Sequence, residues 1–326
     1  KENVYPDPRI GLNNYLIPDV SDEFNVRMDL SKYNYLKSGR NPWQDPYWYR
    51  TEVVLPKSYR GKKVWLILNG INYRADVWVN GRQVADKKDI VGMFRRFKLD
   101  ITGYARAGAN NCIAIKIYQV DHPGVPTPGT QLKVFGPVRG HSYDIFKDET
   151  LKISGGWDCA PVVRDRNMGI YQKVIVEATD EVLIENPFVI TTLPKSTTMP
   201  MKVDTGLAKV NIKLEVRNTS AKLVEGKVNA WITLINEVKF PTYTKHMEGY
   251  LKPIKLTKKV ALRAGERKVV ELTPEDFPSL LIENPYLWYP NGYGEQYLHH
   301  MKLSFSIGGK VSDTKEFDFG IREVAS

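Results

Sequence analysis

The chain is 326 residues long, which suits two domains when one domain takes roughly 150 residues. Hydrophobic residues make up 42% and charged residues 26%, as in ordinary soluble proteins, and no apolar run approaches the roughly 20 residues of a membrane-spanning helix. The net charge is +10, but Lys and Arg are spread along the chain without a basic block. Solvated protein faces are therefore favoured over a nucleic-acid partner.

The first eight residues, KENVYPDP, contain no initiator Met and no apolar core, so they do not read as a signal peptide. They indicate a trimmed chain from which a signal was removed upstream. We therefore expect a periplasmic or secreted protein, which the low cysteine content does not contradict.

The cysteines and histidines of the chain are not spaced as metal ligands usually are. Cys112 and Cys159 are expected to be buried free thiols rather than a single disulfide bridge. His299 and His300 lie in a predicted strand, so their rings should point to opposite faces and cannot share a metal ion. No cofactor or metal site is expected, and no spacing identifies a structural Ca²⁺.

Alternation with a period of two dominates the first half of the chain. Residues 64–68 are apolar on both faces, as in a central sandwich strand, and residues 71–79 alternate between apolar and polar. Asn80-Gly81 then supplies the residues of a type I′ hairpin turn, and residues 112–118 form another predicted strand.

The segment 121–156 is rich in Pro and Gly and is expected to be a long irregular loop over one end of a sandwich. Binding residues concentrate on such loops. Regular alternation resumes after Thr179, most clearly in residues 210–216 and 301–307. Short strands without helices between them predict an all-β chain whose second sandwich is of immunoglobulin-like type.

Two signatures, GWDCAP at residues 156–161 and NMGIY at residues 167–171, resemble glycoside hydrolase family 2. Further stretches resemble the same family in order and approximate spacing: 48–52, 68–70, 77–81, 99–102, 284–294 and 319–323. The resemblance implies a jelly-roll (galactose-binding-domain-like) β-sandwich at 1–179, followed by an immunoglobulin-like β-sandwich at 180–326. The subfamily most resembled contains exo-β-glucosaminidases, endo-β-mannosidases and β-mannosidases.

Members of this family join the two sandwiches to a (β/α)8 barrel that carries two catalytic glutamates and hydrolyses β-glycosides with retention. A barrel needs about 250 residues, and five residues follow Ile321. The resemblance therefore implies that both glutamates lie beyond Ser326 and that this chain alone is inactive. The implied partners are β-linked carbohydrate and the protein's own catalytic barrel.

The resemblance also suggests substrate-binding residues. In β-mannosidase-like members a Trp-Asp pair on a loop of the first domain touches the sugar at the cleavage point, and Trp157 and Asp158 match that pair. An indole face can stack on a pyranose while a carboxylate accepts hydrogen bonds from adjacent hydroxyls. Asn167 is a further candidate, with a turn role equally favoured, and a buried Trp157 with Asp158 capping a turn remains the alternative. Cys159 departs from the mannosidase pattern, which puts the sugar preference in doubt.

The charge of the chain bears on that preference. A surface of +10 repels a polycationic amino-sugar polymer, which mildly favours mannosides or galactosides over chitosan fragments.

Three weaker candidates remain. Arg74 and Asp76 share one face of a predicted strand, where an ion pair within the sheet is favoured over contact with a barrel. The cluster at 43–48 is either an aromatic sugar platform or, as favoured here, a structural Trp-Tyr group. Residues 218–220 fit a glycosylation sequon, which means little if the source is bacterial.

Two alternatives to an enzyme stay open: a free-standing carbohydrate-binding protein and a cell-surface adhesion protein. The family's first domain also has strand sequence ahead of residues 4–8, so we expect an exposed sheet edge and some self-association.

Overall fold

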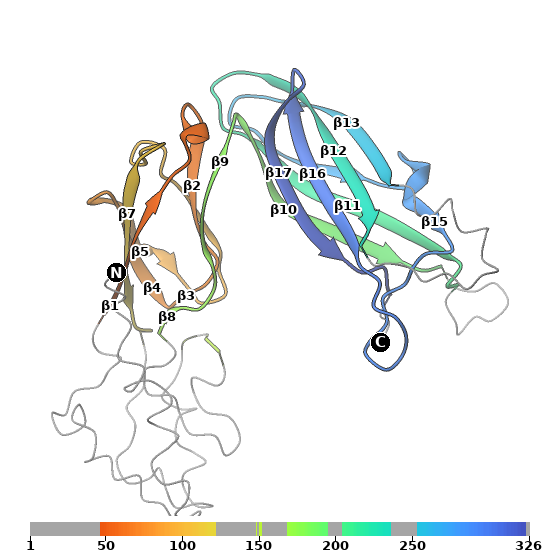
Figure 1. Cartoon of the computed structure of the whole chain (residues 1–326), viewed down its shortest axis with the longest axis horizontal. Coiled ribbons are helices and arrows are strands. Elements are labelled where there is room, and N and C mark those ends of the chain that lie inside the picture. Colours follow the sequence, from red (N-terminus) through yellow and green to blue (C-terminus); the bar gives the residue numbers. More distant parts are fainter. Residues whose placement is uncertain are drawn as a thin grey trace, which may run out of the picture. The chain divides into compact units, whose positions relative to one another are not determined.

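The computed structural model divides into two compact units, Lys1–Ala178 and Thr179–Ser326, each with its own core (Figure 1). Strands dominate both, and the described residues contain no α-helix but two short 3₁₀ helices, η4 (Lys57–Tyr59) and η8 (Pro278–Leu280). The structure describes residues 46–121, 148, 150–151, 168–194, 204–235 and 253–323.

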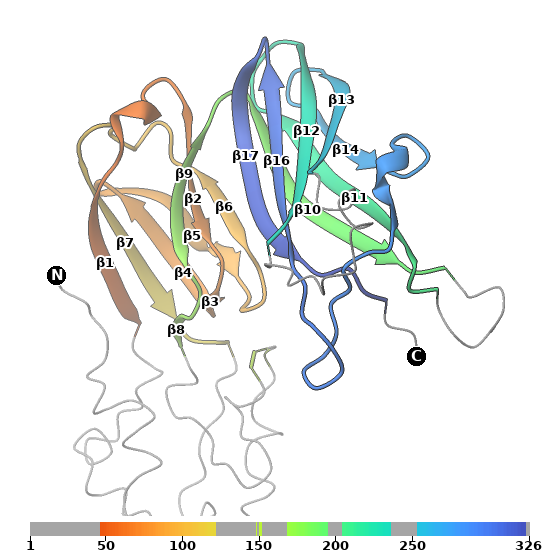
Figure 2. The same cartoon turned by 45° about the vertical axis from the view of Figure 1, so that its right-hand side comes forward.

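The first unit contains three antiparallel groups of strands. The four-stranded sheet has the order β1-β7-β4-β5, the three-stranded sheet has the order β6-β2-β9, and β3 pairs with β8 (Figure 2). The strand bounds are β1 Tyr47–Val54, β2 Lys63–Leu68, β3 Ile71–Asn72, β4 Arg74–Val79, β5 Arg82–Val91, β6 Phe97–Asp100, β7 Asn110–Tyr118, β8 Gly169–Ile170 and β9 Val174–Thr179.

The core of the first unit is built from the inward side chains of these strands. Alternate residues of β4 and β7, such as Val77 and Ile115, are buried with Leu66 and Leu68 of β2. The strand β2 is central, because it pairs with β6 on one side and β9 on the other.

The second unit is a sandwich of two sheets. One sheet has the order β10-β11-β14 with β15 also paired to β11, and the other has the order β13-β12-β16-β17. The strand bounds are β10 Val182–Thr192, β11 Leu207–Asn218, β12 Val224–Leu234, β13 Ile254–Leu262, β14 Arg267–Leu272, β15 Leu281–Glu283, β16 His299–Ile307 and β17 Lys310–Phe319.

A β-bulge connects the two sheets of the second unit. The pairing of β16 with β17 shifts at Phe305 and Ser306, which leaves Ser312 without a register partner. Ser312 and Asp313 are both buried, and their side chains accept hydrogen bonds from the backbone N–H groups of Val182 and Ile184 at 2.8 and 2.7 Å. The side chains at the bulge thus accept hydrogen bonds from backbone N–H groups on the outer edge of β10, which would otherwise be buried without partners.

The all-β class predicted from the alternation is confirmed, and so is the hairpin turn. Asn80 and Gly81 have φ values of 52° and 80° between paired Val79 and Arg82, as a type I′ turn requires. His299 is buried whereas the side chain of His300 is 38% exposed, as expected for opposite faces.

The predicted single strand over residues 71–79 is wrong in one respect. The chain changes direction at Tyr73, which follows a cis peptide bond, and β3 pairs with β8 instead of continuing β4. Asn72 is therefore buried and does not share an outward face with Arg74 and Asp76. The alternation of residue types did not reveal this break.

Candidate functional site

The candidate sugar-binding residues Trp157, Asp158 and Asn167 lie outside the described residues, as does most of the predicted loop 121–156. The structure does describe the two ends of the segment that carries all three, because Leu151 precedes it and Met168 follows it.

Both ends of this segment are fixed to the connection between β5 and β6. The backbone N–H of Leu151 lies 3.1 Å from Sδ of Met93, and the hydroxyl of Tyr171 donates a 2.6 Å hydrogen bond to the carbonyl oxygen of Met93. Met93 is fully buried, and the N–H of Gly92 is held by the carbonyl of Tyr73 at 2.9 Å. The residues that flank the segment 152–167 are therefore both anchored on Met93. We refer to Met93, Tyr171 and Leu151 as the loop base.

Two close backbone approaches tighten the loop base. The Tyr171 ring packs so closely on Gly70 that a Cβ there would lie 2.7 Å from it, and the N–H of Tyr171 donates to the carbonyl of Gly70 at 3.2 Å. Gly169 has a φ of 148°, and a side chain at this position would collide with the phenol oxygen of Tyr49. Only glycine fits at Gly169 without strain.

The sequence pointed to Tyr171 through its signature but gave no reason to select Met93. A glycine before Met93 was the one turn signal nearby, and turn signals do not identify contacts made across 58 or 78 residues.

The expected ion pair between Arg74 and Asp76 is not present. The guanidinium of Arg74 pairs with Asp121, just beyond β7. Asp76 accepts hydrogen bonds from the hydroxyl of Tyr118 at 2.6 Å and from the N–H of Lys87 at 2.7 Å. Burial, with a smaller contribution from Asp76, raises the pKa of Tyr118 to about 12, so this phenol stays a hydrogen-bond donor at neutral pH.

In the second unit, the two signatures at 284–294 and 319–323 meet. Ile321 pairs with Leu287 in a parallel bridge, and its carbonyl accepts a 2.9 Å hydrogen bond from the N–H of Trp288. Gly320 lies against the Trp288 side chain, where a Cβ would come within 2.6 Å, and the guanidinium of Arg322 lies 4.7 Å from the centre of that ring.

The same segment is tied back to β10. The hydroxyl of Thr191 donates to the carbonyl of Arg322 at 2.6 Å and accepts from its N–H at 3.1 Å. The carboxylate of Glu323 accepts a hydrogen bond from the N–H of Leu193 at 2.5 Å. The chain is thus anchored by hydrogen bonds up to Glu323. Tyr293, in the signature at 284–294, is 83% exposed. We refer to residues 284–294 and 319–323 as the junction segment.

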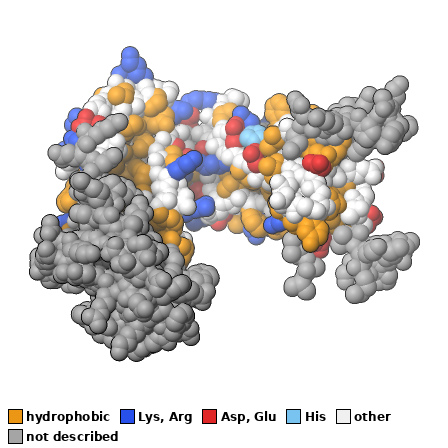
Figure 3. Space-filling view, turned by 60° about the horizontal axis from the view of Figure 1, so that its bottom comes forward, with side chains coloured by type: hydrophobic (Ala, Val, Ile, Leu, Met, Phe, Trp, Pro, Cys, Tyr) orange, Lys and Arg blue, Asp and Glu red, His pale blue; other side chains and the backbone are white. Residues whose placement is uncertain are grey.

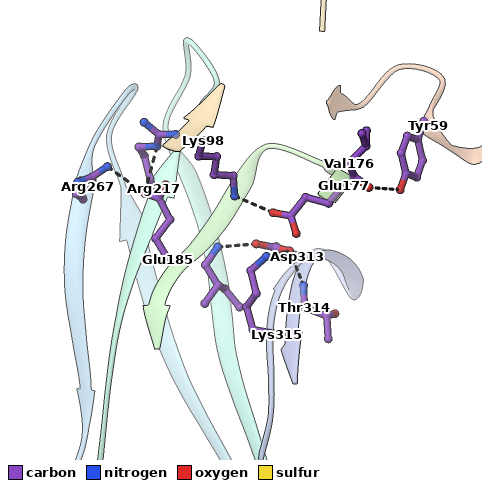
Figure 4. A network of polar contacts seen from close by, with 11 residues as sticks. Tyr59, Lys98, Val176, Glu177, Glu185, Arg217, Arg267, Asp313, Thr314 and Lys315 are labelled. Carbon is purple, nitrogen blue, oxygen red and sulfur yellow. Dashed lines mark hydrogen bonds and ion pairs between the residues drawn. The ribbon is translucent and has the colours of Figure 1, made fainter. Parts of the chain in front are cut away.

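Several of the other charged groups of the described residues form ion pairs within one unit. Figure 4 shows Lys98 paired with Glu177 in the first unit at 2.8 Å and, in the second, Glu185 between Arg217 and Arg267 at 3.5 and 3.1 Å. In Figure 3, Lys and Arg side chains are scattered among uncharged and acidic ones on the face displayed. The face displayed shows no continuous basic stripe of the kind that nucleic-acid-binding proteins present.

Two minor predictions, on Cys112 and on the sequon at 218–220, can be compared with the structure. Cys112 is a free thiol but is half-buried rather than buried, and Cys159 lies outside the described residues. Asn218 of the sequon is 1% exposed, and its amide is fully engaged in hydrogen bonds, so it cannot accept a glycan in the folded state.

Two features are absent from the described residues. No cluster of three or more His, Cys, Asp or Glu side chains there is arranged to hold a metal ion. The same residues include no helix with the length and apolarity needed to cross a bilayer.

Comparison with known proteins decides the family. The model of the glycosyl hydrolase 2 galactose-binding-like domain matches residues 29–172, and that of glycosyl hydrolases family 2 matches residues 184–322. The chain belongs to glycoside hydrolase family 2. Its first unit is the galactose-binding-like sandwich of this family and its second unit the immunoglobulin-like sandwich, as the resemblance implied.

Several family 2 relatives are enzymes. The chain is 30% identical to an exo-β-D-glucosaminidase of Amycolatopsis orientalis over 86% of its own length and 21% of the relative's. It is 27% identical to a mannosylglycoprotein endo-β-mannosidase of Lilium longiflorum over 100% of its length and 29% of the relative's.

The crystal structure of the exo-chitosanase CsxA of Amycolatopsis orientalis superposes with a TM-score of 0.61 at 28% identity, covering 89% of this chain and 29% of that one. The chain thus spans between a fifth and a third of the length of these family 2 enzymes.

Proposed function

We propose that this chain is the accessory N-terminal region of a retaining family 2 β-glycosidase and that its first domain completes the glycone pocket of a (β/α)8 barrel. The substrates in view are β-mannosides, β-glucosaminides or β-galactosides. In this proposal the chain alone has no catalytic activity, because both glutamates belong to the barrel.

The observation that carries the proposal is the loop base. Both ends of the segment 152–167 are held at Met93, one through its sulfur atom and one through its carbonyl oxygen. A segment whose ends are fixed in this way loses less conformational freedom when its side chains engage a ligand. Such an arrangement suits Trp157 and Asp158 to stacking on a sugar and to accepting hydrogen bonds from its hydroxyls. Asn167, one residue before buried Met168, is proposed as a further hydroxyl contact.

The junction segment supports the part of the proposal that concerns a partner domain. Its aromatic residues are presented on a backbone fixed by Thr191 and by the pairing of Leu287 with Ile321. Tyr293, at 83% exposure, is a large side chain that a neighbouring domain can cover. Tyr and Trp are enriched in protein interfaces of this kind.

A substitution in the full-length enzyme tests the pocket role. Asp158→Ala should lower kcat/KM on the preferred aryl β-glycoside by roughly 5- to 150-fold, since one unmatched hydrogen-bonding group in a buried site costs about 1 to 3 kcal/mol. The control is Asp276→Ala, which removes a half-exposed carboxylate paired with Lys258 in the second unit. Unchanged kinetics in Asp158→Ala would remove the pocket role, and equal losses in both variants would indicate a general effect on folding.

A further inference from the structure

The outer face of the sheet β1-β7-β4-β5 carries a set of side chains that the proposed function does not use. Trp48, Arg50 and Glu52 stand at alternate positions of β1 and so point to the same side of the sheet. Trp48 is 37% exposed, and the side chains of Arg50 and Glu52 are 44% and 47% exposed. Together they form a row at the sheet edge. The row is roughly 13 Å long, because side chains on one face of a strand are spaced about 6.7 Å apart.

The indole of Trp48 is held in place from the neighbouring strands. Trp78 of β4 lies with its ring centre 5.0 Å away and its plane tilted by 34°. Ala114 of β7 is in register between Arg50 and Trp78, and its single methyl group leaves room for the two indoles to meet. The ammonium of Lys116 lies 5.3 Å from the Trp48 ring centre. An exposed aromatic ring fixed in this way loses little side-chain freedom when a ligand stacks on it.

The polar groups beside Trp48 are ordered as well. Arg50 donates to one carboxylate oxygen of Glu52 at 2.6 Å, and the amide of Asn110 donates to the other at 2.8 Å. These two hydrogen bonds hold the pKa of Glu52 below its ordinary value, so the carboxylate is charged at neutral pH. It keeps spare lone pairs for hydroxyl donors, while Arg50 keeps spare N–H groups for hydroxyl acceptors.

The charges of this face favour a neutral ligand. Arg50 is paired with Glu52, and Arg74 is paired with Asp121. Asp76 accepts from Tyr118, and the ammonium of Lys116 lies over the rings of Trp48 and Tyr118. With its charges engaged on the face itself, the surface offers stacking and hydrogen bonding rather than a strong field.

The face is also a poor match for a protein partner. The apolar centre of a protein interface is depleted in charged residues, whereas here Arg50 and Glu52 are the next two side chains after Trp48 on the same face of β1. A sugar ring suits the pattern better, because it presents an apolar C–H face and a rim of hydroxyl groups.

We infer that the row Trp48–Arg50–Glu52 is a second carbohydrate-binding site that takes a neutral β-linked oligosaccharide along β1, with one ring stacked on Trp48. The inference does not depend on a catalytic barrel or on the segment 152–167.

The test titrates the chain with cellohexaose and with β-1,4-mannohexaose by calorimetry, in about 0.05 M and about 0.5 M NaCl. We expect binding of at least one of them at about 1 mM Kd or better, equal at both salt concentrations. Trp48→Ala should weaken it about tenfold or more, as expected for the loss of about 1.4 kcal/mol.

The matched control is Trp231→Ala. Trp231 is 43% exposed on β12 and has the ammonium of Lys255 4.4 Å from its ring centre, so it shares the exposure and the cation but lies in the other unit. Its loss should leave binding unchanged. If Trp48→Ala fails to fold, Arg50→Ala tests the same site. The Arg50 side chain is exposed, so its loss should weaken binding several-fold without affecting the core.

Absence of binding for both hexasaccharides overturns the inference, and so does binding that Trp48→Ala leaves intact or that both Trp variants reduce equally. Binding that disappears at high salt also overturns it, because a charged ligand would then be the one recognised. None of these results bears on the Asp158→Ala test, which concerns another segment of the first unit.

Discussion

The side chain of Asn218 should be one of the largest single contributors to the stability of the second unit. Its Nδ2 donates to the carbonyl oxygens of Lys222, Leu262 and Arg263 at 2.7, 3.3 and 2.9 Å. Its Oδ1 accepts from the N–H and the hydroxyl of Ser220 at 2.9 and 2.8 Å. One amide thus joins the ends of β11 and β13 and the turn that leads into β12.

Asn218→Ala leaves these partners without the amide. The Leu262 carbonyl is buried, so its loss of a partner costs about 1 to 3 kcal/mol, while the part-buried groups can recruit water at a cost of about 0.5 kcal/mol each. We expect a total of about 3 to 5 kcal/mol, which corresponds to a fall in Tm of roughly 6 to 20 °C for a unit of this size.

The control is Asn229→Ala. The amide of Asn229 bonds the hydroxyls of Ser304, Ser306 and Thr257, none of which is buried. These hydroxyls can turn to water, so the variant should lose only about 0.5 to 1 kcal/mol. Both variants are compared by thermal unfolding of the whole chain, followed by far-UV circular dichroism. Equal and small losses would contradict this role of Asn218, and so would a glycan found on Asn218 of folded protein from a glycosylating host.

Three further predictions concern His299, Ser312 and Tyr171. Burial lowers the pKa of His299 from 6.5 to about 4, so the unfolded chain binds the extra proton between these values. The contribution of His299 to the free energy of unfolding should therefore be full above pH 6.5 and fall by up to about 3 kcal/mol towards pH 4. In a series of Tm measurements against pH, His299→Phe should lack this part of the fall. An identical slope in the variant would contradict the role of His299. Ser312→Ala removes the hydroxyl that both accepts from the N–H of Val182 at 2.8 Å and donates to its carbonyl at 2.9 Å. It should cost about 2 to 3 kcal/mol in urea unfolding, whereas a loss below about 0.5 kcal/mol would mean that water replaces the hydroxyl. Tyr171→Phe removes the hydrogen bond from the Tyr171 hydroxyl to the carbonyl oxygen of Met93. It should reduce kcat/KM of the full-length enzyme about fivefold while lowering Tm by less than about 3 °C. A Tm loss without a kinetic change would limit Tyr171 to a structural role.

Much of the fold could be predicted because it depends on local signals. The alternation in β7, β11 and β16 fixes which side chains enter the cores, and Asn80-Gly81 fixes a hairpin. The opposite environments of His299 and His300 follow from the same period of two.

The features that could not be predicted depend on contacts between distant residues. The bulge at Ser312 looks like ordinary alternation in sequence, and its purpose is visible only beside Val182, 130 residues away. Arg74 pairs with Asp121 rather than with Asp76 because the end of β7 brings that carboxylate near. Met93 has no sequence signal for its contacts with Leu151 and Tyr171.

The roles of Trp157, Asp158 and Asn167 remain predictions. The structure describes the ends of their segment and not these residues, so their functional assignment still depends on the family pattern and on the loop base. The predicted self-association also remains a prediction; among the described strands, β1 forms one edge of its sheet.

The accessory role of this chain can be tested by assaying the full-length gene product and this chain alone on a panel of aryl β-glycosides. We expect the full-length protein to hydrolyse one glycoside with retention of configuration and the chain alone to hydrolyse none. Hydrolysis by the chain alone, or a full-length protein that binds glycans but hydrolyses no member of the panel, would contradict this role.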